Sequence, residues 1–95
     1  MNWQEIEGRL VDVMETLADI EHQRWSHWQR YMHDKCAQRP DGSLVIPPDL
    51  VVKWERQIST SYSLLAEREK ESDSEQVKKY LPTIISAFSD QFHRG

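Results

Sequence analysis

Charged and aromatic side chains lie close together in one early stretch of this sequence. It contains Glu21, His22, Arg24, Trp25 and Trp28. On a helix, these residues occupy neighbouring turns, so a planar guanidinium can lie beside aromatic faces. That arrangement suits stacking on a flat ring and pairing with a phosphate or a carboxylate. The structural alternative is that the tryptophans pack in the core and that Arg24 pairs with an acid of the protein itself.

Arg24 and Asp73 form the most informative pair of charges. Each falls on the apolar stripe of its own expected helix, where a charge is costly unless it is compensated. We therefore predict that the two side chains face each other, directly or through a bound anion. Lys70 precedes Asp73 by three residues and supplies a second cation. A structural lock and a ligand site both fit this pattern, and both stay open.

Metal-binding and catalytic patterns are weak. His22, His27 and His33 are spaced by five and six residues, which does not place them on one helical face, and neither HExxH nor CxxC occurs. His22 beside Glu21 could act as a base, but the sequence has no nucleophile elbow, P-loop or dinucleotide fingerprint. We predict a non-enzymatic protein with no metal and no cofactor, and we rank an enzyme that uses His22 last.

The composition is that of one folded domain. The 95 residues are 38% hydrophobic and 29% charged and include four tryptophans. A net charge of −4 without a long Lys/Arg run argues against general nucleic-acid binding. The single cysteine, Cys36, fits a reducing compartment. Without a signal-peptide pattern or a long apolar run, we predict a cytoplasmic protein with no membrane segment.

A long amphipathic helix is expected from Trp3 to about Asp34. Its 32 residues would span roughly 48 Å, whereas a compact domain of this size is about 32 Å across. The helix must therefore bend, break or project, and a projecting apolar seam would need a partner, so a homodimer is one expected outcome. The seam consists of residues that recur every three or four positions: Ile6, Leu10, Val13, Leu17 and Ile20.

The remaining segments predict a mainly α fold, in which the long helix packs against two or three shorter helices. The loop at about 35–48 contains the turn signal Asp41-Gly42 and could form a very short β-hairpin. Proline at a helix start, charge-rich stretches and apolar spacing define the other elements. These are a helix at Pro48–Ile58 with a break at Ser59–Ser61, a turn at Tyr62–Leu65, a charged helix at Glu67–Lys79, and, after Pro82, a last helix at Thr83–Phe92.

Two blocks of the sequence resemble the ryanodine-receptor repeat (RyR) domain. The fragment Ile20-Glu21-His22-Gln23-Arg24-Trp25 is similar to its H-x-R-W start, and Tyr62-Ser63-Leu64-Leu65 followed by Glu69-Lys70-Glu71-Ser72-Asp73 is similar to its Y-x-x-L and E-K-x-x-D blocks. The matches span roughly residues 17–82. The family's Gly-Trp turn, Arg-Asp pair and His-Pro are missing between them, so a binding surface on the family's central loop cannot be carried over.

The resemblance implies a compact helical module of the kind found in the giant calcium channels and in small bacterial or phage proteins. It implies ligand sensing or scaffolding, with nucleotide-like ligands. We therefore expect a binding module for a small, anionic, nucleotide-like ligand, and the alternative is a protein-interaction or scaffold module that dimerises through the N-terminal helix. The expected ligand-binding residues are His22, Arg24, Trp25, Trp28, Lys70 and Asp73.

Overall fold

The computed structural model describes the backbone of residues 1–92 and the side chains of residues 1–90. Within the chain, which we predicted to be a single domain, contacts group into two compact units. The first unit contains residues 1–24 and the C-terminal segment from residue 73. The second contains residues 25–72.

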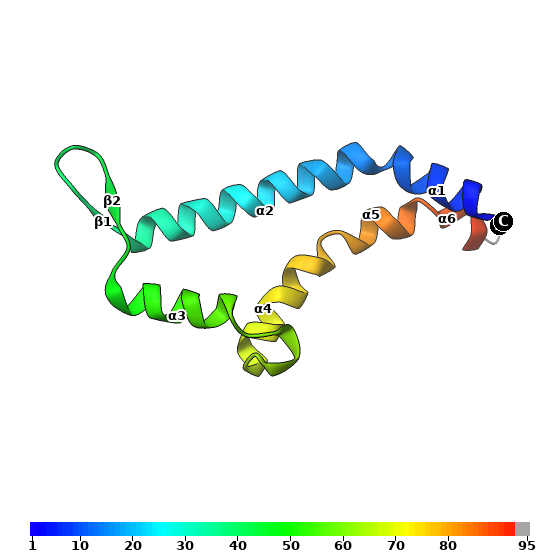
Figure 1. The fold of residues 1–95 in the computed structure, drawn as a ribbon. Helices are drawn as coiled ribbons and strands as arrows, with labels where there is room; N and C mark the ends of the chain where they lie inside the picture. The colour runs from blue at the N-terminus through cyan, green and yellow to red at the C-terminus, as the bar shows by residue number, and fades with distance from the viewer. Residues whose placement is uncertain (93–95) are drawn as a thin grey trace. The chain divides into compact units, whose positions relative to one another are not determined.

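The expected N-terminal helix is present as two helices (Figure 1), α1 at Trp3–Asp12 and α2 at Met14–Lys35. Asn2 caps α1, because its side-chain oxygen accepts the Glu5 N–H at 2.9 Å. The interruption lies at Val13, whose φ of −102° and ψ of 8° depart from helical values. Of the three outcomes expected for so long a helix, the structure shows a break.

A two-stranded antiparallel sheet follows α2 (Figure 1). Strand β1 is Ala37–Gln38 and strand β2 is Leu44–Val45. Ala37 pairs with Val45, and Gln38 pairs with Leu44. The expectation of a mainly α fold with a very short hairpin is thus confirmed.

The hairpin turn has the chemistry that its sequence predicts. Gly42 has a φ of 91°, a left-handed conformation that glycine adopts without steric cost. The Asp41 carboxylate accepts the Ser43 N–H at 2.9 Å and the Ser43 hydroxyl at 2.7 Å. These bonds, the hydroxyl one first, lower the pKa of Asp41.

Helix α3 runs from Pro48 to Ile58, as predicted. Proline in its first turn sacrifices no hydrogen bond, and Asp49 there opposes the helix dipole. At its end, the Ser59 hydroxyl donates to the carbonyl of Glu55 at 3.0 Å. The predicted turn follows as a short 3-10 helix, η1, at Tyr62–Leu64.

Helix α4, Glu67–Lys78, carries the charge-rich stretch. Lys70 lies 3.6 Å from Glu67, and Lys78 lies 2.9 Å from Glu75, each pair spaced by three residues. These are the local ion pairs expected for this helix.

The C-terminal segment differs from the prediction. We expected one helix at Thr83–Phe92, but the structure has α5 at Leu81–Ser86 and α6 at Ser89–Phe92. Proline is tolerated because it lies in the first turn of α5. The chain then tightens, and Phe88 N–H bonds to the carbonyl three residues earlier at 3.0 Å, which separates the two helices. The Phe92 side chain, which we expected to pack, lies outside the described side chains.

Long-range ion pairs link elements within each unit. In the first unit, the Arg9 guanidinium of α1 donates to the Asp90 carboxylate of α6 at 2.8 Å and to the carbonyl of Ala87 at 3.2 Å. In the second unit, Arg56 of α3 donates to Glu69 of α4 at 3.0 Å. Every described side chain, including those of these ion pairs, is half-buried or exposed.

Candidate functional site

Arg24 pairs with an acid of its own helix. Its Nε donates to Oε2 of Glu21 at 3.0 Å, and its Nη2 donates to the other carboxylate oxygen. The Tyr80 hydroxyl, at the start of α5, also donates to Oε2 of Glu21. All three residues belong to the first unit. The carboxylate therefore binds a guanidinium and a phenol, and the Arg24 side chain stays 39% exposed.

This cluster shifts the pKa values of its members. The hydrogen bond from Arg24, and after it the bond from Tyr80, lowers the pKa of Glu21 to about 2. The same carboxylate raises the pKa of Arg24. It also raises the pKa of Tyr80, because a phenol that donates to a carboxylate gives up its proton less readily. Near neutral pH, the carboxylate is thus negative, the guanidinium is positive and the phenol is neutral.

Arg24 does not pair directly with Asp73 in the structure, so the direct form of that prediction was wrong. The only described acid that forms an ion pair with Arg24 is Glu21, and Asp73 lies exposed on α4. The structural alternative, in which Arg24 pairs with an acid of the protein, is the one that the structure shows. Arg24 pairs with Glu21 because side chains three positions apart on one helix lie on the same face, within reach of each other.

The predicted tryptophans belong to the second unit. Trp28 stacks on Tyr31, with ring centroids 5.6 Å apart, and meets Trp54 of α3 edge-on at 5.5 Å. Trp25 is 52% exposed, and Trp28 and Tyr31 are each 41% exposed. The Trp28 ring therefore packs against Tyr31 and Trp54, while part of the surface of Trp28 and Tyr31 faces solvent.

Lys70 also belongs to the second unit, where it lies near Tyr62 and Glu67. Its ammonium lies 5.9 Å from the centroid of the Tyr62 ring and 3.6 Å from the Glu67 carboxylate. Of the six predicted ligand-binding residues, His22, Arg24 and Asp73 lie in the first unit, and Trp25, Trp28 and Lys70 lie in the second.

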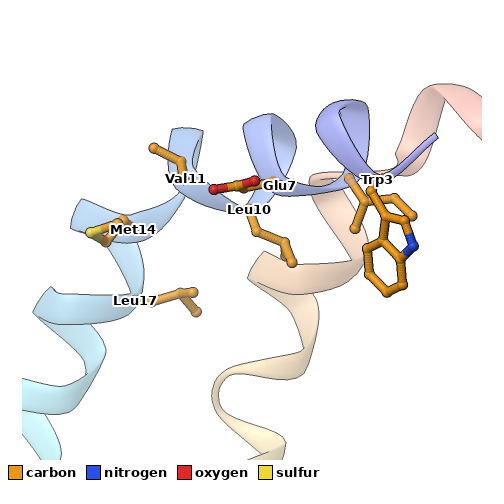
Figure 2. A pocket seen from close by; sticks show the side chains of 7 residues that line it. Trp3, Glu7, Leu10, Val11, Met14 and Leu17 are labelled. Atoms are coloured by element: carbon orange, nitrogen blue, oxygen red, sulfur yellow. The ribbon is translucent and has the colours of Figure 1, made fainter. Parts of the chain in front are cut away.

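Helix α1 and the start of α2 form a second candidate site, an open apolar groove of about 640 Å³ (Figure 2). Trp3 is 82% exposed and Met14 is 54% exposed, whereas Ile6, Leu10 and Leu17 are half-buried. One charged residue, Glu7, is among the lining residues. The lining consists of Trp3, Ile6, Glu7, Leu10, Val11, Met14 and Leu17.

The apolar seam that the sequence predicts for the N-terminal helix covers part of this groove. The predicted seam included Ile6, Leu10 and Leu17 but omitted the other apolar lining residues, Trp3, Val11 and Met14. Trp3 precedes Ile6 by three residues, a spacing that would have placed it on the same face. Met14 follows Leu10 by four residues, a spacing that would also have placed it on this face.

The described residues contain no group of three or more His, Cys, Asp or Glu side chains arranged to hold a metal ion. Within the same part of the chain, no helix combines the length and the apolar character that crossing a membrane requires. Comparisons with protein-family models, curated proteins and solved structures found no match. The resemblance to the RyR domain therefore stays a prediction.

Proposed function

We propose that this chain is a non-enzymatic scaffold module that dimerises through its N-terminal helix. The open groove along α1 and the start of α2 is the observation that supports this function. Its most exposed member, Trp3, presents a large apolar surface to water. Contiguous apolar surface of this kind is typical of a protein contact, because burying it in an interface removes it from water.

A second copy of the chain is the occupant that fits the groove. A groove along a helix accepts the apolar ridge of another helix, and the same stretch of this chain supplies such a ridge. When one surface provides both the groove and the ridge, two identical chains can bury it symmetrically, as most homodimers do. The scaffolding role that the RyR resemblance implies is compatible with this function.

Analytical ultracentrifugation over a range of protein concentrations tests the dimer. We expect wild type to be dimeric and Trp3→Ala to weaken the association by about thirtyfold or more, since a tryptophan that becomes buried in an interface is a frequent hot spot. Ile58→Ala is the matched control, because Ile58 is 76% exposed but lies in the second unit. A wild type that stays monomeric at every concentration, or a Trp3→Ala variant that associates as tightly, would contradict the proposal.

A second candidate is the binding of a small, anionic, nucleotide-like ligand in the second unit. The stacked and partly exposed rings of Trp28 and Tyr31 favour it, because a flat ring can stack on them. The Lys35 ammonium lies 5.4 Å from the centroid of the Tyr31 ring and would attract negative charge. Arg24 does not contribute to this candidate, because its charge is matched by Glu21.

Titration of nucleoside mono-, di- and triphosphates against tryptophan fluorescence tests this candidate. We expect quenching that saturates and that Trp28→Leu abolishes, whereas Trp3→Phe leaves it unchanged because Trp3 lies in the other unit. Absence of a saturating signal across these nucleotides would exclude nucleotide binding at these rings.

A further inference from the structure

Five of the six apolar residues that line the groove, all except Val11, follow a spacing that reads the same in both directions. From Trp3 to Ile6 is three residues, from Ile6 to Leu10 is four, from Leu10 to Met14 is four, and from Met14 to Leu17 is three. In a second copy turned end for end about Leu10, each of these five residues therefore comes level with another apolar residue of the same set. Trp3 comes opposite the partner's Leu17, and Ile6 comes opposite the partner's Met14. The seam is self-complementary in the antiparallel orientation.

Charge favours the same orientation. Glu7 is the only charged residue that the structure places along the described groove. In a parallel pair, the two Glu7 side chains would flank the same level and repel each other. In an antiparallel pair centred on Leu10, each Glu7 instead comes level with the partner's Val13. The two helix dipoles also oppose each other in this orientation.

We propose that two copies pair through α1 and the first turn of α2 in antiparallel orientation, with Leu10 on the twofold axis and Trp3 of each copy against Leu17 of the other. This inference rests on the proposed dimer and adds its register and direction. It assigns Trp3 the role of an anchor at each end of the interface, because it is the largest and most exposed side chain of the seam.

Spin labels on the outer face of the helices test the direction. Asp12 and Asp19 both point away from the seam, so their labels do not enter the interface. Each is changed to cysteine in a Cys36→Ser background, which leaves one thiol per chain. In the antiparallel dimer, the two Asp12 positions are about 6 Å apart along the helix axis. The two Asp19 positions lie seven residues further from the centre in each chain and are therefore much farther apart. In a parallel dimer, both axial separations are close to zero.

Double electron–electron resonance on the two labelled variants then gives three outcomes. A clearly longer distance for the Asp19→Cys label than for the Asp12→Cys label supports the antiparallel pair. Equal distances overturn the antiparallel register but leave the dimer standing. In the third outcome, ultracentrifugation finds only monomer and the labels show no dipolar coupling at the same concentrations. That result overturns both the register and the proposed function.

A second measurement tests the register at its centre. With Leu10→Cys in the same Cys36→Ser background, mild oxidation should link two identical chains rapidly, because residue 10 meets itself on the axis. Val52→Cys is the control, because Val52 is 70% exposed but lies in the second unit. Linking of Leu10→Cys no faster than of Val52→Cys would overturn Leu10 as the centre.

Discussion

Arg24 falls on the apolar stripe that the sequence pattern defines, and its charge is matched by a carboxylate of the same helix. Glu21 accepts two hydrogen bonds from the guanidinium and one from the Tyr80 hydroxyl. The cluster is partly exposed, so its Coulomb energy is screened by solvent. Its clearest consequence is therefore the titration of Glu21, whose pKa falls from the ordinary 4.5 to about 2.

A carboxylate NMR titration of Glu21 tests this cluster. Because the pKa of Glu21 is lowered on folding, its contribution to stability is present above about pH 4.5 and is lost as the pH falls towards 2. Arg24→Met should raise the pKa of Glu21 further than Tyr80→Phe does, since Arg24 is the larger cause. Asp73→Asn is the control and should leave it unchanged. An ordinary pKa for Glu21 in wild type would contradict the cluster.

At the scale of the elements, α1 and the hairpin each contain one glycine, and the two glycines differ in backbone conformation. Gly8 lies within α1, and an added Cβ there would meet no atom within 4 Å. Gly42 closes the hairpin turn with a φ of 91°. A methyl group is therefore free to fit at the first position, whereas at the second it strains the backbone.

The two substitutions should have opposite effects on thermal unfolding. Gly8→Ala should stabilise the protein by about 0.5–1 kcal/mol, because alanine loses less backbone freedom in a helix than glycine. Gly42→Ala should destabilise it by about 1–2 kcal/mol, because a side chain disfavours left-handed backbone. Each kcal/mol shifts Tm by about 4–8 °C in a domain of this size. Shifts of the same sign in the two variants would show that one of the two backbone assignments is wrong.

At the scale of the whole molecule, association through α1 and α2 links stability to concentration. Any contact made only by the folded chain raises the apparent stability by mass action. Tm of the wild type should therefore rise with protein concentration. For Trp3→Ala, Tm should be lower and should depend less on concentration, whereas Ile58→Ala should keep the wild-type slope. Protein concentrations of about 5 μM and about 500 μM span a range over which mass action shifts the midpoint of a dimer measurably. A wild-type Tm that is the same at both concentrations would contradict the dimer.

The sequence by itself predicted the features that depend on neighbouring residues. The fold class, the hairpin turn at Asp41-Gly42 and the bounds of α3 follow from glycine and proline geometry and from apolar spacing over a few turns. The local ion pairs of α4 and most of the apolar seam follow for the same reason.

The tertiary structure decided which of several compatible partners each group has. Arg24 could have met Asp73 or Glu21, and only the folded positions of Glu21 and of Tyr80, 59 residues further along, settle the choice. Likewise, the pairing of Arg9 with Asp90 joins residues 81 positions apart. The break at Val13 is equally invisible in a uniform apolar period. Helical spacing specifies which face a side chain occupies, whereas its partner depends on what the rest of the chain brings to that face.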